Sequence, residues 1–216
     1  DGTLTSFCGS GDGFVTTWYD QSGNGNDATQ STAASQPKIV DAGVLVTENG
    51  KAAIDFDGVD DHLAATPIDP SFISAFLTSK VNNRLPNQRL LSLKSSTYDL
   101  LFMIRDTPDG ILYRSHTNDL FSVELGILNE DYVQFSLISY FSDVSNKELY
   151  QNQQEITTTI DDPTGANSNE SFWIGGREGF SDYGAIKMQE LIIYPSDQST
   201  NRVGIETNIN NHYGIF

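Results

Sequence analysis

The sequence predicts an all-β chain, a two-sheet antiparallel β-sandwich of the jelly-roll type that ends in a short C-terminal helix. Three observations lead to this class. Apolar residues alternate with polar ones or form short continuous runs along almost all of the 216 residues. Turn clusters rich in Gly, Asn and Asp separate these runs at the close spacing of β-sandwiches. The hydrophobic share of 38% is enough for one core, so we expect a single domain over residues 1–216.

The predicted strands are short segments bounded by turn residues. The first, from Val15 to Tyr19, shows the pattern, because it alternates the β-branched and aromatic residues that favour strands. We find no internal repeat and no linker. The segments cover residues 14–19, 52–56, 61–66, 73–81, 88–94, 99–105, 110–115, 120–125, 131–141, 146–156, 171–176 and 186–194.

The end of the chain has a different pattern. Ile205, Ile209 and Tyr213 recur at a spacing of four, which is the period of an amphipathic helix. Asp197 and Ser199 are candidates for its N-terminal cap. The sequence therefore predicts a C-terminal helix over residues 197–213 that packs at the edge of the sandwich.

The charge of the chain restricts its partners. There are 29 acidic and 12 basic residues, giving a formal net charge of −17 and a pI of about 4.2. Nucleic acid is a poor partner for such a surface, because phosphate binding needs clustered Lys and Arg. No run reaches the ~18 apolar residues of a membrane-spanning segment. We expect an extracellular protein, secreted or at a cell surface, whose partner is a neutral glycan or an acidic one bridged by a cation.

Three motifs resemble those of one family. They are Tyr-Asp-Gln-Ser-Gly-Asn-Gly-Asn at 19–26, Phe-Asp-Gly-Val-Asp-Asp-His-Leu at 56–63, and Phe-Trp-Ile-Gly-Gly at 172–176 followed by Met-Gln-Glu-Leu-Ile-Ile-Tyr at 188–194. In this order they resemble laminin-G-like, or concanavalin-A-like, jelly-roll domains. Members often carry a further strand or two before the first motif, so we expect the chain to lack its first strand. The resemblance implies the fold, but such domains serve binding, catalysis and architecture alike.

The residue pattern favours a non-catalytic carbohydrate-binding or adhesion module, part of a larger multidomain protein. Aromatic faces stack on sugar rings, and neighbouring polar side chains bond the hydroxyl groups. The segment 173–183 concentrates both kinds of residue around three glycines, and the central strands add more. The candidate carbohydrate-binding residues are Trp173, Arg177, Phe180, Asp182, Tyr183, Tyr98, Tyr113 and Arg114. Core packing is the alternative role for Trp173, and an exposed sheet face is the alternative for Arg114.

Two other functions stay open: a glycoside hydrolase or polysaccharide lyase on this scaffold, and a structural or protein-binding spacer. The loop at 19–26 is also similar to the catalytic domain of arabinofuranosidase B. That family has an acid directly after an Ile-Gly-Gly strand end, where this chain has Arg177. A lyase arrangement would need Tyr113 beside Arg114 and His116. Strand alternation places Arg114 and His116 on one face of the strand and Tyr113 on the other. We therefore assign no catalytic residue.

Calcium is the expected metal if one is bound, because it takes oxygen ligands from carboxylates and carbonyls. Asp57 and Asp60, in the turn after the second strand, are the candidate ligands. Asx hydrogen bonds within the turn are the alternative role for these carboxylates. In relatives, the resemblance implies a structural calcium held by an Asp of the last strand. The matching residue here is Gln189, which carries no charge.

Overall fold

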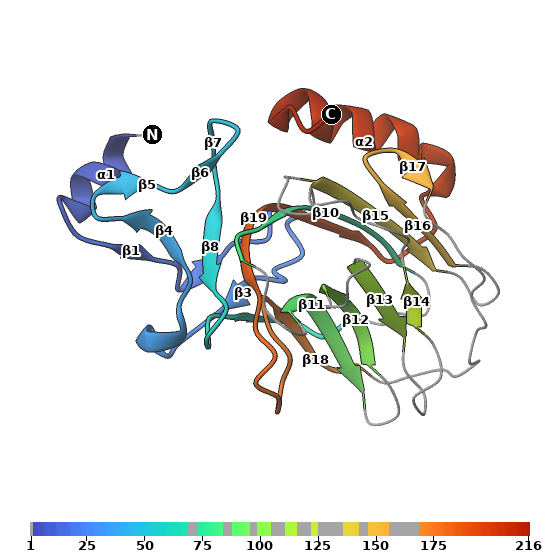
Figure 1. The fold of residues 1–216 in the computed structure, drawn as a ribbon, viewed down its shortest axis with the longest axis horizontal. Helices are drawn as coiled ribbons and strands as arrows, with labels where there is room; N and C mark the ends of the chain where they lie inside the picture. Colours follow the sequence, from blue (N-terminus) through green and yellow to red (C-terminus); the bar gives the residue numbers. More distant parts are fainter. Residues whose placement is uncertain are drawn as a thin grey trace.

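The computed structural model has the predicted β-sandwich fold (Figure 1). It describes residues 2–68, 73–83, 88–95, 99–104, 111–115, 122–124, 136–142, 147–155 and 169–216. Two antiparallel sheets pack face to face, and a C-terminal helix covers the outside of one of them. Within these ranges, no helix is long and apolar enough to cross a membrane.

The larger sheet contains nine strands among the described residues. Their order is β1-β4-β8-β19-β10-β15-β16-β17, and β5 pairs with β4. The strands are β1 (Gly13–Phe14), β4 (Lys38–Asp41), β5 (Val44–Leu45), β8 (Ile54–Asp57), β10 (Ile73–Val81), β15 (Ser136–Ser142), β16 (Lys147–Gln151), β17 (Gln154–Glu155) and β19 (Ala185–Tyr194).

The second sheet contains eight strands in the same described ranges, in the order β14-β13-β12-β11-β18-β9-β3-β2. Its strands are β2 (Thr17–Trp18), β3 (Ala28–Thr29), β9 (Leu63–Ala65), β11 (Gln88–Ser95), β12 (Asp99–Ile104), β13 (Ile111–Ser115), β14 (Ser122–Glu124) and β18 (Asn169–Ile174). A separate hairpin joins β6 (Thr47–Glu48) to β7 (Lys51–Ala52). Among the described residues, the helical elements are α1 (Gly2–Cys8), two 3₁₀ turns (Ala33–Ser35 and Ser199–Asn201) and α2 (Arg202–Tyr213).

The main core lies between the two sheets. Phe56 of β8 and Leu63 of β9 are fully buried there, and they come from opposite layers. Strand β18 shows how alternation fills this space: Phe172 and Ile174 belong to the core, whereas Trp173 between them is only partly buried. Because successive side chains of a strand point to opposite faces, Trp173 lies on the outer face of the eight-stranded sheet.

Helix α2 confirms the predicted C-terminal helix and covers the outer face of the nine-stranded sheet (Figure 1). Ile209, 2% exposed, packs with Phe76 of β10 and Leu137 of β15 in a second cluster. These are interior strands, so the helix lies over the sheet rather than at its edge. Gly214 ends the helix in the left-handed conformation, with φ of 63°. Oδ1 of Asp197 accepts the backbone N–H of Ser199 at 2.8 Å, where the 3₁₀ turn that precedes α2 begins, but the N-cap position itself is Gln198.

Three predicted strands are each divided in the structure. The segment 52–56 includes the end of β7 and most of β8, which belong to different sheets. The segment 14–19 forms β1 and β2, which belong to different sheets, and the N–H of the intervening Val15 bonds Pro37 O at 2.8 Å. The segment 146–156 forms the hairpin β16–β17. Asn152 and Gln153 turn this hairpin with positive φ of 49° and 68°. Such values break a strand, and Asn adopts them more readily than most residues.

Candidate functional site

The loop from Gly175 to Gly184 joins β18 to β19 and carries four of the eight predicted sugar-binding residues. Its two ends are tied together, because Gly184 N donates to Gly175 O at 2.9 Å. Gly175 has φ of 79°, and a Cβ there would lie 2.4 Å from the ring of Phe56. Only glycine therefore allows the loop to leave the sheet so close to the core.

Three rings meet at the base of this loop. The imidazole of His62 stacks on the indole of Trp173, with centroids 3.9 Å apart and planes 6° from parallel. Tyr183 lies next to them, 6.0 Å from His62 and tilted by 37°. Gly176 makes room for this contact, since a Cβ there would come within 2.9 Å of the Tyr183 ring. The three half-buried rings form an aromatic cluster on the outer face of the eight-stranded sheet.

Hydrogen bonds fix the orientation and the tautomer of His62. Its Nδ1 lies 2.9 Å from Asp60 O, and its Nε2 lies 2.8 Å from Nε2 of Gln30. A carbonyl oxygen can only accept and an amide nitrogen can only donate, so Nδ1 carries the proton and Nε2 accepts. Gln30 is buried and is held in turn, because its Oε1 accepts from Thr32 N at 2.9 Å. Both ring nitrogens of His62 thus have a partner within the protein.

A buried ion pair anchors the far end of the loop. Nη2 of Arg89, on β11, lies 2.7 Å from Oδ2 of Asp182. The Arg89 side chain is 4% exposed and that of Asp182 is 24% exposed. Burying a guanidinium is costly unless a carboxylate pairs with it, so this contact holds the loop against the sheet. Asp182 remains a predicted sugar ligand, but its carboxylate already has this partner.

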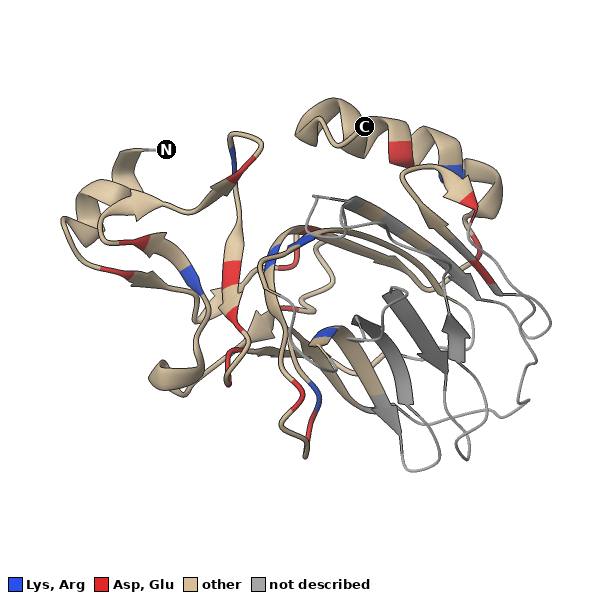
Figure 2. Cartoon of the chain, viewed as in Figure 1, with Lys and Arg blue, Asp and Glu red and all other residues tan. Residues whose placement is uncertain are grey.

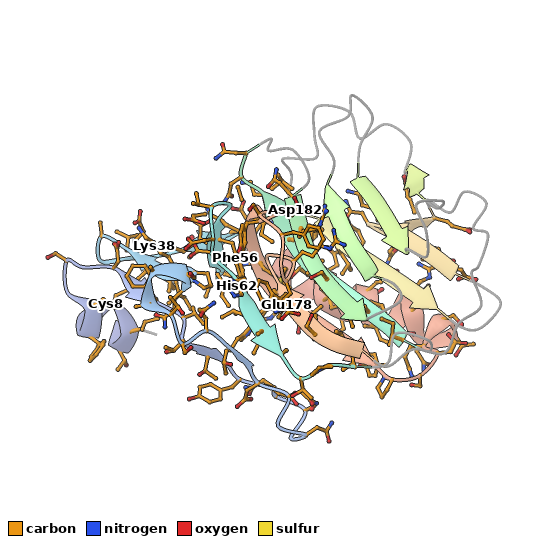
Figure 3. All side chains as sticks on the ribbon, turned by 90° about the horizontal axis from the view of Figure 1, so that it is seen from below. Cys8, Lys38, Phe56, His62, Glu178 and Asp182 are labelled. Atoms are coloured by element: carbon orange, nitrogen blue, oxygen red, sulfur yellow. The ribbon has the colours of Figure 1, made fainter. Side chains whose placement is uncertain are left out.

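The tip of the loop is the more exposed part. The Arg177 guanidinium lies over the Phe180 ring, 3.6 Å from its centroid, and Phe180 is 46% exposed. This cation–π contact leaves an apolar ring and a charged group side by side at the surface. Figure 3, which looks onto the eight-stranded sheet, shows His62, Glu178 and Asp182 in this one region of the molecule.

The structure thus gathers Trp173, Arg177, Phe180, Asp182 and Tyr183 in and beside one loop. Of the other predicted residues, Tyr113 and Arg114 belong to β13. Tyr98, with Arg105 and His116, lies outside the described residues. On β13, the backbone register places Arg114 in the same cross-strand row as Ser92 and Trp173. Tyr113 belongs to the next row, with Leu91 and Ile174. Three strand spacings, roughly 14 Å, separate Arg114 from Trp173.

Sequence reasoning missed His62, Gln30 and Arg89. His62 lies within a recognised motif, yet its partner Trp173 is distant in the sequence, and a lone histidine gives no signal of its own. Gln30 stands in a loop for which no strand or motif was predicted. Arg89 is the second residue of β11, a strand whose leucines read as core. Only the pairing of β18 with both β9 and β11 brings these residues to one place.

Three aspartates of the turn after β8 also lie together. One carboxylate oxygen from each of Asp57, Asp60 and Asp61 falls within 4.8 Å of the others. Burial, with the neighbouring negative charges of Asp57 and Asp60, raises the pKa of Asp61 to about 6. Asp57 Oδ1 accepts the N–H of Val59 at 2.7 Å, and Asp60 Oδ2 accepts from Ser35 at 2.9 Å. The turn therefore has both the Asx hydrogen bond and the cluster of carboxylate oxygens that the sequence left open as alternatives.

The loop at 19–26, by contrast, is organised by one carboxylate. Asp20 accepts from the N–H and the hydroxyl of Ser22, at 2.7 and 2.8 Å, and from the N–H of Asn26 at 3.0 Å. The bond from Asn26 and those from Ser22 lower the pKa of Asp20 to about 2. These bonds give the motif a structural role, that of holding a polar turn.

No model of a known protein family matches the sequence, and no curated protein does. Solved structures do match the fold. They include Trypanosoma rangeli sialidase in complex with sialic acid (TM-score 0.63, 13% identity, covering 89% of this chain and 31% of that one). A second match is domain 4 of AbnA, a GH43 extracellular arabinanase from Geobacillus stearothermophilus, in complex with arabinotriose. Its TM-score is 0.53 at 15% identity, and the match covers 91% of this chain and 87% of that one.

The CBM40 of Ruminococcus gnavus IT-sialidase, bound to α2,3 sialyllactose, is a third structure with this fold (TM-score 0.51, 15% identity, covering 72% of this chain and 97% of that one). The chain spans about 30% of the length of the sialidases that it matches. At these identities the similarity establishes the fold alone, a β-sandwich shared with domains of carbohydrate-active proteins.

Proposed function

We propose that this chain is a carbohydrate-binding module that holds a glycan on the aromatic cluster and the adjoining 175–184 loop. The observation that carries the proposal is the His62–Trp173 stack on the outer face of the eight-stranded sheet. A tryptophan kept out of the core and braced by a parallel ring supplies the flat apolar surface that sugar C–H groups favour. Phe180 and Tyr183 would extend this surface along the loop.

The laminin-G-like motifs and the structural neighbours support a glycan ligand. Two of those neighbours are domains bound to oligosaccharides, arabinotriose and sialyllactose. An adhesive or surface-binding role in a larger extracellular protein agrees with both. The acidic surface favours an uncharged glycan. Figure 2 shows that Lys and Arg lie on several separate elements, interspersed with Asp and Glu, among the described residues.

An enzyme on the same scaffold is the alternative, and one observation favours it. Asp61, with its pKa raised to about 6 beside two other carboxylates, has the character of a glycosidase acid. Asp61 is only 5% exposed, however, which limits the access of a substrate to its carboxyl group. The same three aspartates offer the hard oxygen ligands that calcium prefers, and we propose calcium as their ligand if the module needs a metal.

A glycan array, run with calcium and with chelator, tests these functions together with an assay for new reducing ends. We expect binding to neutral glycans without product, and at least a tenfold loss of affinity in Trp173→Ala. Tyr19→Ala, which removes a 66% exposed aromatic from another loop, should bind as the wild type does. New reducing ends would show that the chain is an enzyme and not a binding module. Neither binding nor product would leave a structural or protein-binding spacer.

A further inference from the structure

The β6–β7 hairpin directs three backbone carbonyls at one nitrogen atom. Nε2 of Gln189, on β19, lies 2.9 Å from Glu48 O, 2.9 Å from Lys51 O and 3.2 Å from Ala52 O. The hairpin turns through Asn49 and Gly50, both with positive φ, as two-residue turns of this kind require. Three carbonyl oxygens around a single point make a concentrated negative potential, of the sort that proteins often neutralise with a cation.

The position of Gln189 makes this arrangement informative. The laminin-G-like motifs imply a structural calcium at this point of the last strand, held by an aspartate. The residues present do not fit that ion, because the amide nitrogen itself stands where the carbonyls converge. The reverse amide orientation would set Oε1 against the three carbonyl oxygens, which repel it. As placed, Oε1 is buried with no hydrogen-bond partner among the described residues, whereas both N–H groups are directed at acceptors.

We propose that the Gln189 side-chain amide replaces a structural cation and fixes the β6–β7 hairpin without metal. The hairpin in turn connects the nine-stranded sheet to helix α2 through side-chain contacts. Glu48 bonds Lys80 of β10 at 2.7 Å, and Asn49 Nδ2 donates to Gly214 O, at the C-terminal end of α2, at 2.9 Å. A neutral donor keeps this connection in place when calcium is scarce, so the fold around α2 is independent of calcium.

The isosteric variant Gln189→Glu tests the proposal, because it sets a carboxylate against the three carbonyls. In chelator we expect its Tm to fall by about 4 to 8 °C relative to the wild type, and calcium chloride should restore most of that loss. Gln189→Met, which lacks donors and charge, should lose a similar amount with no recovery in calcium. Gln154→Glu, at an exposed position of β17, adds the same charge away from the hairpin and should respond to neither.

The three-aspartate turn after β8 is a second place where calcium could act. The native glutamine is therefore measured in an Asp60→Asn background, which weakens that group. With the ionic strength held equal, we expect its Tm to be the same in calcium and in chelator. A rise in Tm with calcium in this background would show that a cation binds beside Gln189 and would overturn the proposal. Identical behaviour of Gln189→Glu and Gln154→Glu would overturn it too.

Discussion

At the scale of single residues, two polar side chains beneath the 175–184 loop already have hydrogen-bond partners in the protein. His62 Nε2 accepts from Gln30, and the Asp182 carboxylate pairs with Arg89. To take a proton from a substrate, His62 would first have to lose the Gln30 bond. What these residues leave toward solvent is ring surface, which suits stacking on a sugar better than proton transfer.

Two glycines with nearly the same backbone angle should respond differently to a methyl group. Gly175 and Gly25 have φ of 79° and 76°, but only at Gly175 would a Cβ meet another atom, the Phe56 ring. We expect Gly25→Ala to lower the free energy of unfolding by about 1 to 2 kcal/mol, from backbone strain. Gly175→Ala should lower it by about 3 kcal/mol or more, because overpacking adds to the strain.

Denaturant unfolding of both variants measures this difference, with the slope of the transition as a check that both unfold from a compact state. The Gly175 variant should also lose glycan affinity, since the loop begins at this residue. Equal destabilisation of the two variants would mean that Phe56 moves aside freely and that the loop is not held by the core.

At the scale of elements, helix α2 carries a carboxylate into the interface that it covers. Glu206 is fully buried and pairs with Arg202 at 2.8 Å, one turn away. Burial raises its pKa above the ordinary value, and Ser139 and Arg202 offset only part of that effect. A carboxylate with a raised pKa in the folded state binds its proton more tightly there than in the unfolded chain. Protonation therefore favours folding.

The sign of the pH dependence follows from this. The contribution of Glu206 to stability is fully present below its unfolded pKa, near 4.5, and is lost as the pH rises through the higher folded value. We expect the wild type to gain stability relative to Glu206→Gln as the pH falls from 8 toward 4.5. Unfolding free energies of the two proteins across this range measure the gain. Parallel curves would show that the folded pKa of Glu206 is unshifted.

Elements that depend on local pattern were predictable from the sequence, and those that depend on pairing were not. Strand β10 has the bounds predicted for it, Ile73–Val81, because most of its residues are apolar or β-branched. The predicted strand 14–19 is wrong in its continuity, since Val15 bonds outside the strand and the chain changes sheets there. Asn49-Gly50 is a hairpin signal in the sequence, but that Gln189 bonds this hairpin follows only from the packed structure.

The same distinction applies to the site. Five predicted residues fall in one segment, so their proximity could be inferred from the chain alone. The stack that braces Trp173 joins residues from β18 and from the turn before β9, which become neighbours only when these strands pair. The Asp20 turn was predictable in kind, because Asp, Ser and Asn in this order bond their own backbone.

At the scale of the whole molecule, the excess of acidic residues opposes folding. With 29 carboxylates and 12 Lys and Arg, one-to-one pairing leaves 29 − 12 = 17 acidic groups without a cation. The more exposed ion pairs, such as Lys38 with Asp12 at 2.9 Å, contribute little each. Repulsion among the remaining carboxylates acts over the whole surface, and salt screens it over a Debye length of about 10 Å at 0.1 M.

Sodium chloride should therefore stabilise this protein rather than weaken it. We expect the Tm, measured in chelator, to rise by about 2 to 4 °C between low ionic strength and roughly 0.5 M salt, since screening the repulsion outweighs the loss of a few surface pairs. Tetramethylammonium chloride at the same ionic strength should give the same rise, because screening does not depend on which cation provides it. A rise confined to sodium would indicate a bound ion, and a fall in Tm would mean that the ion pairs outweigh the net charge.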